Sequence, residues 1–134
     1  MPLLLDTCTL FWLSSNQKDL SKNSQDALVE HAGDLFVSAI SALEFVTNVA
    51  KGKMRLPSQL PSQDAILWFR KILAQHEVSQ IPINFQIAGQ SGKLPLHHKD
   101  PFDRIIIATA LEYKMTIVTP DKLIRQYSEV ECLW

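Results

Sequence analysis

The segment HHKDPFDRIIIATA, residues 97–110, places two carboxylates three positions apart at the start of an apolar helical pattern. Helix chemistry alone explains either of them. Asp100 is well placed to cap the helix, with Pro101 in the first helical position, where its missing N–H costs nothing. Asp103 would then face the free amides and the positive end of the helix dipole. Whether these two carboxylates do more depends on the other acids of the chain.

Four acidic residues stand where predicted strands end or predicted helices begin. Each has a structural role open to it as a helix cap, and Glu44 completes a capping box with Ser41 by spacing. Taken together they indicate different chemistry, because carboxylates gathered at one edge repel one another unless a cation neutralises them. A hard divalent ion such as Mg²⁺ or Mn²⁺ prefers oxygen ligands, lowers the pKa of a bound water and stabilises charge on a phosphodiester. The candidate metal ligands and catalytic residues are Asp6, Glu44, Asp103 and Asp121.

The elements that must position these acids alternate between short apolar segments and helical patterns, which indicates an α/β fold. Each predicted strand is apolar on both sides, so we expect a mostly parallel sheet with helices on both faces. Ligands of such a sheet bind beyond the carboxyl ends of the strands, where the strand order reverses. The expected strands are residues 2–5, 35–39, 78–83, 115–119 and 130–134. The expected helices are residues 7–13, 21–31, 42–51, 64–75, 84–90 and 101–113, and residues 56–63 form a turn-rich connection.

Length and composition predict one globular domain, residues 1–134. A formal net charge of -1 and an isoelectric point near 6.4 argue against binding of nucleic acid through overall charge, so such a partner would meet a local basic patch. The apolar N-terminus has no basic region and is too short to span a bilayer, so we expect neither export nor membrane association. Cys8 and Cys132 lack metal-site spacing and are interpreted as packing residues of a cytoplasmic protein with reduced thiols.

Five motifs occur in order along the chain. They are LLLDT, VSAISALEF, KGKMRLP, LPLHHKDPFDRIIIATAL and TIVTPD, at residues 3–7, 37–45, 51–57, 94–111 and 116–121. Together they resemble the PIN-domain ribonucleases, and within that family the VapC-like toxins of bacterial toxin–antitoxin pairs. The resemblance implies a three-layer PIN-like fold with a sheet of about five strands, and an enzyme that cuts single-stranded regions of RNA with Mg²⁺ or Mn²⁺. It also implies a separate antitoxin protein as partner.

Residue by residue, this resemblance assigns the acids of the family's metal site to Asp6, Glu44, Asp103 and Asp121. Asp100 matches an extra acid of the subgroup that carries DPFDR, and we interpret it as a cap with a supporting role. Hydroxyl groups beside the acids would orient carboxylates or water, although Ser and Thr at strand-to-helix turns are also ordinary caps. These supporting candidates are Thr7, Ser38 and Thr119.

Basic residues and histidines near the acids form a weaker set of candidates. Two basic clusters would hold RNA phosphates, with a solvated basic surface as the simpler alternative. They are Lys51, Lys53 and Arg55, and Lys99 with Arg104. His97 and His98 have no His or Cys partner at zinc-like spacing, so we interpret them as loop residues or as residues that support the metal ligands, not as general bases.

Two alternative functions stay open from the residues. A metal-dependent phosphohydrolase would use Asp6 as a phosphoryl acceptor, but the haloacid dehalogenase pattern needs a second Asp where this chain has Cys8. A non-catalytic PIN-like module that binds RNA or protein is the other alternative, and the presence of all four acids argues against it.

The predicted helix over residues 64–75 carries more apolar residues than one packing face holds. A twofold contact is the commonest way to bury the remainder, so the pattern predicts a homodimer. The apolar residues are Ile66, Leu67, Trp68, Phe69, Ile72 and Leu73.

Overall fold

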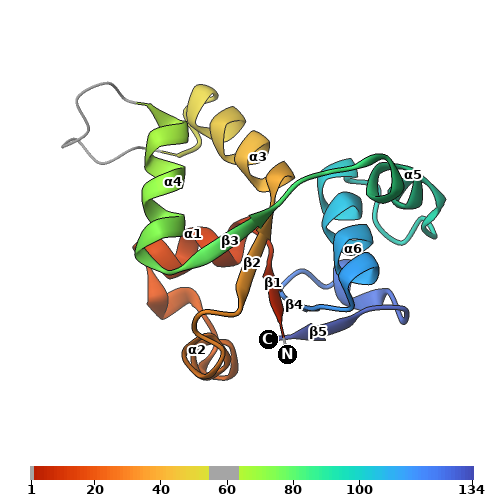
Figure 1. Ribbon diagram of the computed structural model, residues 1–134, viewed down its shortest axis with the longest axis horizontal. Coiled ribbons are helices and arrows are strands. Elements are labelled where there is room, and N and C mark those ends of the chain that lie inside the picture. Colours follow the sequence, from red (N-terminus) through yellow and green to blue (C-terminus); the bar gives the residue numbers. More distant parts are fainter. Residues whose placement is uncertain (1, 55–63) are drawn as a thin grey trace.

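The computed structural model describes residues 2–54 and 64–134. Helices separate each strand from the next along the chain, as Figure 1 shows. The strands are β1 (Leu3–Leu5), β2 (Leu35–Ser38), β3 (Val78–Ile81), β4 (Thr116–Val118) and β5 (Glu131–Leu133). The α-helices are α1 (Thr7–Ser15), α2 (Lys22–Glu30), α3 (Ala39–Ala50), α4 (Ala65–Gln75), α5 (Phe85–Lys93) and α6 (Pro101–Tyr113). Two short 3₁₀ helices, η1 (Gln17–Asp19) and η2 (Ile124–Gln126), complete the described elements.

The five strands form one sheet in the order β3-β2-β1-β4-β5, and every neighbouring pair is parallel. Leu3 pairs with Leu35 on one side and with Thr116 on the other, which makes β1 the central strand. The chain moves outward from β1 in one direction through β2 and β3, and later in the other direction through β4 and β5. The strand order therefore reverses next to β1, and the carboxyl ends of β1 and β4 flank the place where such sheets bind ligands.

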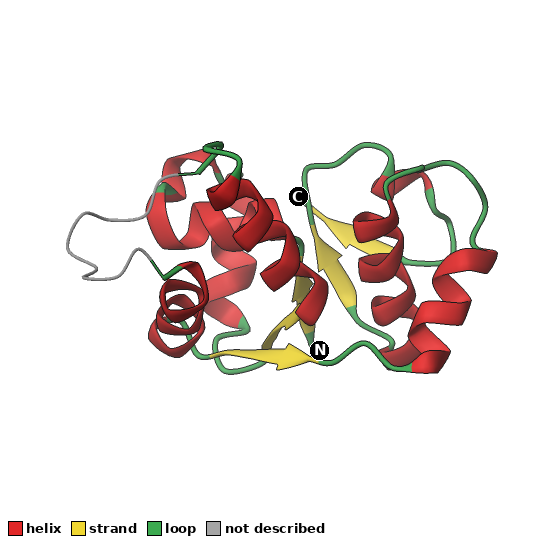
Figure 2. Cartoon of the chain, turned by 90° about the horizontal axis from the view of Figure 1, so that it is seen from above, coloured by secondary structure: helices red, strands yellow, loops and turns green. Residues whose placement is uncertain are grey.

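Helices cover both faces of the sheet, because neighbouring residues of each strand point to opposite sides. Leu3 and Leu5 pack into a core built with residues of α1, α2, α3 and α4. Leu4 and Ile117 pack into a second core with residues of α5 and α6. Figure 2 shows the strands between these two groups of helices. The predicted three-layer α/β fold with a parallel sheet is confirmed.

The start of α3 differs from the sequence prediction. The helix begins at Ala39, and Ser38 caps it by accepting a hydrogen bond from the amide of Ile40 (3.1 Å). The predicted capping box of Ser41 and Glu44 is therefore wrong: Ser41 lies inside the helix, and its Oγ accepts a hydrogen bond from Thr7 Oγ1 (2.8 Å). Either serine could cap a helix, because Ser is a common N-cap residue. Ser38 is the cap because β2 ends at this residue.

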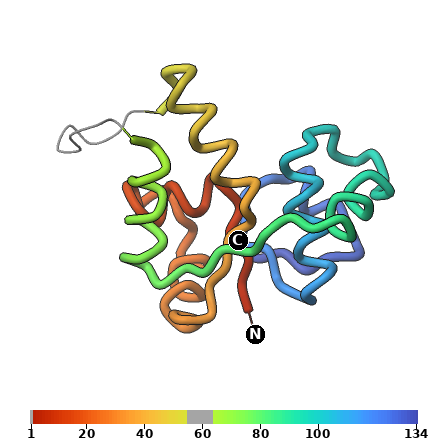
Figure 3. The backbone as a smooth tube through the Cα atoms, turned by 45° about the horizontal axis from the view of Figure 1, so that its top comes forward, coloured from red at the N-terminus to blue at the C-terminus, as the bar shows by residue number. Residues whose placement is uncertain are grey.

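Helices α3 and α4 lie side by side, as Figures 1 and 3 show. Phe45 of α3 packs against Trp68 and Phe69 of α4 with tilted rings, whose centroids lie 5.0 and 5.6 Å apart. Residues 55–63 of the connection between these helices, which include Arg55 and the predicted turn-rich stretch, lie outside the described residues. None of the described helices has the length and apolar character needed to cross a membrane.

Lys114 ends α6 in the left-handed conformation (φ 55°, ψ 51°), and its amide donates to the carbonyl of Ala110. A side chain with a Cβ is strained in this region, whereas glycine is not. We expect Lys114→Gly to raise the free energy of unfolding in urea by about 0.5–1 kcal/mol, after the entropy that glycine adds to the unfolded chain. Gly33→Ala, at φ 88°, is the opposite control and should lower it by about 1 kcal/mol. A destabilised Lys114→Gly variant would contradict the strain at this cap.

Candidate metal centre

A cavity of about 250 Å³ opens at the carboxyl ends of β1 and β4. It is lined by residues from four separate parts of the chain: the β1–α1 junction, α3, the first turn of α6 and the loop after β4. The lining residues are Asp6, Thr7, Cys8, Glu44, Asp103, Pro120 and Asp121. The four predicted acids therefore share one cavity.

Asp6 is buried and serves two roles. It caps α1, because its Oδ1 accepts a hydrogen bond from the amide of Thr9 (2.8 Å). Its Oδ2 accepts a hydrogen bond from Thr119 Oγ1 (2.5 Å), which links the ends of β1 and β4. Burial raises the pKa of Asp6, and the hydrogen bonds from Thr119 and Thr9 oppose this effect. The capping role and a place in the acidic cavity are thus compatible.

Glu44 has no capping role in the structure, since it lies beyond the first turn of α3. Its Oε1 is buried and has no hydrogen-bond partner among the described residues. A buried polar atom without a partner costs free energy that a cation or a bound molecule would recover. Of the four acids, Glu44 is the one whose place helix chemistry explains least.

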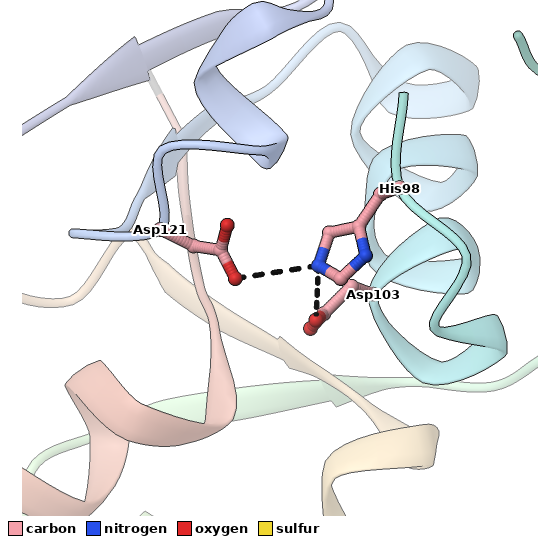
Figure 4. Close-up of side chains that lie close together, drawn as sticks. All are labelled: His98, Asp103 and Asp121. Carbon is pink, nitrogen blue, oxygen red and sulfur yellow. Dashed lines mark hydrogen bonds and ion pairs between the residues drawn. The ribbon is translucent and has the colours of Figure 1, made fainter. Parts of the chain in front are cut away.

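The side chain of His98 lies against the carboxylates of both Asp103 and Asp121, as Figure 4 shows. The Nε2 atom of His98 lies 2.8 Å from Asp103 Oδ2 and 3.3 Å from Asp121 Oδ2. Burial, and after it the negative charge of Asp100, raise the pKa of Asp103 to about 7. Asp121 Oδ1 accepts hydrogen bonds from two backbone amides of its own loop, those of Leu123 (2.7 Å) and Ile124 (3.2 Å).

His98 is the residue of this cavity region that sequence analysis did not separate from its neighbour. His97 is exposed and packs edge-on against Tyr127, with ring centroids 4.9 Å apart. His98 is only 7% exposed and turns its ring toward the acids. No local sequence signal separates the two adjacent histidines, because only the packing of the loop before α6 decides which of them faces the acids.

Except for Thr7, the predicted supporting residues either contact the acids or cap the helices that carry them. Thr119 Oγ1 donates to Asp6 and accepts from the amide of Asp121 (3.0 Å). Asp100 caps α6 through the amide of Phe102 (2.9 Å). Ser38 caps α3, whereas the hydroxyl of Thr7 donates to Ser41 and not to a carboxylate.

Arg104 does not face the surface, and the prediction that it contacts RNA is wrong. It is 8% exposed, and its guanidinium donates to the carbonyls of Leu94 (2.8 Å), Pro95 (3.0 Å) and His98 (3.1 Å). These bonds hold the loop before α6 against the helix. Lys51, Lys53 and Lys99 are exposed, and Arg55 lies outside the described residues.

The two cysteines are free in the structure, and both are half-buried. Burial and the charges of Asp6 and Glu44 raise the pKa of the Cys8 thiol to about 12. A thiol in that state is a poor nucleophile at neutral pH. The cavity therefore offers carboxylate oxygens and hydroxyl groups as its reactive surface.

The family model described as "PIN domain" matches residues 3–130 of the chain. The chain belongs to the PIN domain family. Ribonuclease VapC22 of Mycobacterium tuberculosis is 32% identical over 126 residues, which cover 93% of this chain and 91% of that protein. The predicted resemblance is thereby confirmed.

Solved structures share the fold of this PIN domain at low sequence identity. VapBC2 from Rickettsia felis, bound to a DNA fragment from its promoter, superposes with a TM-score of 0.71 at 16% identity, covering 98% of this chain and 97% of that chain. DNA-bound VapBC from Salmonella typhimurium gives 0.70 at 14% identity, with 98% and 96% coverage. The fold is therefore the one that these VapBC structures contain.

The donor set of the PIN-domain cavity fits a hard divalent cation. All four acids are oxygen donors, Glu44 Oε1 lacks a hydrogen-bond partner among the described residues, and burial raises the pKa of both Asp6 and Asp103. Burial makes the charged forms of Asp6 and Asp103 costly, and a bound cation would offset that cost as it would satisfy Glu44 Oε1. Divalent ions such as Mg²⁺ bind one or a few carboxylates together with water and phosphate oxygens. Among the described residues, potential ligand atoms of His98, Asp103 and Asp121 lie within 4.8 Å of one another, and Asp6 and Glu44 line the same cavity outside this group.

The raised pKa of Asp103 predicts how stability depends on pH without divalent ions. Between the ordinary value of 3.8 and about 7 the native state binds more protons than the unfolded chain. The free energy of unfolding should therefore fall as pH rises through this interval. Urea unfolding in EDTA should show a smaller fall for Asp103→Asn, because that variant no longer ionises there.

The control for this measurement is Asp26→Asn, which removes an exposed carboxylate paired with Lys22 at 2.9 Å. It should keep the pH dependence of the parent. A parent and an Asp103→Asn variant with identical pH profiles would show that the Asp103 carboxyl ionises in the folded protein as it does in the unfolded chain.

Proposed function

We propose that this PIN-domain protein is a metal-dependent endoribonuclease that hydrolyses phosphodiester bonds in single-stranded regions of RNA and acts as the toxin of a toxin–antitoxin pair. The observation that carries the proposal is the meeting of four carboxylates, from four separate segments, in one cavity at the reversal of strand order. The name of the relative Ribonuclease VapC22 supports the same activity.

In this proposal Asp6, Glu44, Asp103 and Asp121 would hold Mg²⁺ or Mn²⁺. When bound, the cation supplies a water of lowered pKa and stabilises negative charge on the scissile phosphate. Thr119 and the amide of Thr9 keep both oxygens of Asp6 in fixed directions. No side chain has to act as nucleophile, which agrees with the poor reactivity of the Cys8 thiol.

The RNA would lie across the same edge of the sheet, with its phosphates near exposed lysines. Lys51 and Lys53 follow α3, the helix that carries Glu44, and Lys99 precedes α6, the helix that carries Asp103. Because the chain carries a net charge of -1, contact with RNA would depend on such local charges and on salt.

An antitoxin would inhibit the enzyme by placing an Arg or Lys side chain among Asp6, Glu44 and Asp103, while an apolar segment fills the neighbouring groove. The structural neighbours described as VapBC complexes support an antitoxin as the partner of this chain. We place the pair in the cytoplasm, where both the RNA substrate and a reducing environment for the two free cysteines are found.

The two alternative functions make different demands on the site. A non-catalytic PIN-like module would need no divalent ion, and a phosphohydrolase would act on small phosphate esters and spare RNA. Degradation of single-stranded RNA by the purified protein with Mg²⁺, stopped by EDTA, would exclude both. Intact RNA together with release of phosphate from a small ester would favour the phosphohydrolase.

The acids can be tested apart from their helices. Asp103→Asn and Glu44→Gln keep the size of each side chain, and neither residue accepts the capping bond of its helix, which Asp100 and Ser38 do. Without divalent ions both variants should be as stable as the parent or more stable, because one member of a repelling cluster is neutral. Cleavage of RNA in Mg²⁺ should nevertheless fall by orders of magnitude, since an amide is a poor ligand of Mg²⁺.

Asp100→Asn is the matched control from the same segment, and it should cost about 1 kcal/mol of stability or less while RNA cleavage stays near the parental level. Near-parental cleavage by Asp103→Asn would remove that residue from the proposed metal site.

We also propose a homodimer formed through α4. Phe69, Ile72 and Leu73 are buried in the core, while Ile66 and Leu67 remain 39% and 40% exposed. Light scattering at micromolar concentration should give about 30 kDa, twice the 15.2 kDa of one chain. Leu67→Glu should lower the mass to that of a monomer, and Val29→Glu, on α2, should not. A monomeric parent would contradict the proposal.

A further inference from the structure

His98 makes several polar contacts near the acids, and the proposed function gives this residue no role. Its Nε2 faces two carboxylates of the acidic cavity, and both its backbone and its other ring nitrogen are engaged as well. A buried histidine beside two acids can serve as a metal ligand or as a hydrogen-bond donor to the ligands. The contacts on the opposite side of the ring decide between these roles.

The tautomer of His98 follows from its Nδ1 atom. The backbone amide of Asp100 donates to Nδ1 at 3.2 Å. An amide N–H can donate only to a nitrogen that carries a lone pair, so Nδ1 is unprotonated and the proton of the neutral ring lies on Nε2. A protonated Nε2 has no lone pair for a cation, and it donates to Asp121 Oδ2 at 3.3 Å. Asp103 Oδ2 lies 2.8 Å from the same nitrogen, beside this hydrogen bond.

The position of the ring is fixed by contacts to the backbone of His98. Its amide donates to the hydroxyl oxygen of Tyr127 (3.0 Å), and its carbonyl accepts from Arg104 Nη1 (3.1 Å). Both partners are buried, Tyr127 at 1% and Arg104 at 8% exposure. The donor that faces the two carboxylates is therefore held in place before any cation arrives.

We propose that His98 is a positioning residue: its Nε2–H donates to the Oδ2 atom of Asp121 and the same nitrogen lies against the Oδ2 atom of Asp103, so that the cavity presents these carboxylates to a divalent cation in one arrangement. The inference rests on the proposed metal-dependent function. Donors behind metal ligands commonly change metal affinity by about 10–100-fold when they are removed. His98 would act in this way without touching the cation or the substrate.

The role of His98 is tested first by NMR on the unmodified protein. Long-range ¹H–¹⁵N correlation of the His98 imidazole in EDTA, at a pH where the ring is neutral, should show a protonated Nε2 and an unprotonated Nδ1. The pattern should persist after addition of Mg²⁺. Transfer of the proton to Nδ1 on addition of Mg²⁺ would make Nε2 a ligand of the cation and would overturn the proposal.

The second test measures Mn²⁺ affinity by calorimetry at one fixed pH. His98→Phe fills the space of the ring without a donor and should bind Mn²⁺ about 10-fold more weakly or worse. His98→Gln, whose amide donates from a similar reach, should recover much of the loss. His97→Gln is the matched control, because that exposed neighbour does not face the acids, and it should bind as the parent does.

The outcomes also separate this inference from the proposed function. Parental Mn²⁺ affinity in His98→Phe would overturn the positioning role, while a parent that binds Mn²⁺ and cuts RNA would keep its function. A purely structural role would lower the unfolding midpoint of His98→Phe and leave its Mn²⁺ affinity unchanged, which again contradicts the proposal. A parent that neither binds Mn²⁺ nor cuts RNA would overturn the proposed function and, with it, the positioning role. The NMR measurement would then report only which ring nitrogen of His98 carries the proton.

Discussion

The mutual repulsion of carboxylates drawn to one edge of the sheet is the constraint around which this protein is organised. Asp6, Glu44, Asp103 and Asp121 line one cavity of about 250 Å³. Burial raises the pKa values of Asp6 and Asp103, and the negative charge of Asp121 adds to this effect at both. The acids stay together because each is carried by a different element of a packed parallel sheet, so the free energy of the whole fold holds them in place.

The fold orients these carboxylates with neutral donors. Asp6 accepts hydrogen bonds from a backbone amide and from the hydroxyl of Thr119, and Asp121 accepts from backbone amides and from the ring of His98, which also lies against Asp103. Arg104 lies in the same segment, but its guanidinium donates to backbone carbonyls of the loop before α6. Neutral donors fix direction without cancelling charge. The cavity therefore keeps the negative charge that a divalent cation would need, and the buried arginine stabilises the loop that carries His98.

Local chemistry was enough to predict most elements of the fold. The helix over residues 101–113 was predicted with both ends correct, because Asp100 and Pro101 define its start and the apolar pattern its length. The start of α3 was misplaced by three residues, since Ser38 and Ser41 are equally good caps in isolation. Only the pairing of β2 with β1 and β3, which extends the strand to its end at Ser38, decides between them.

The sequence by itself determined the fold class and the family, and it predicted the acids of the site, because strand and helix periodicity, caps and motif order are properties of neighbouring residues. Tertiary structure decided which side chains face the cavity. It turned His98 toward Asp103 and left His97 at the surface, and it buried Arg104 where a basic surface patch had been expected. Adjacent residues of the same type differ in such roles only through long-range contacts, here those of Tyr127 and Arg104 with the His98 backbone. Those contacts form once α6 and the loop after β4 have packed together, and no local pattern encodes them.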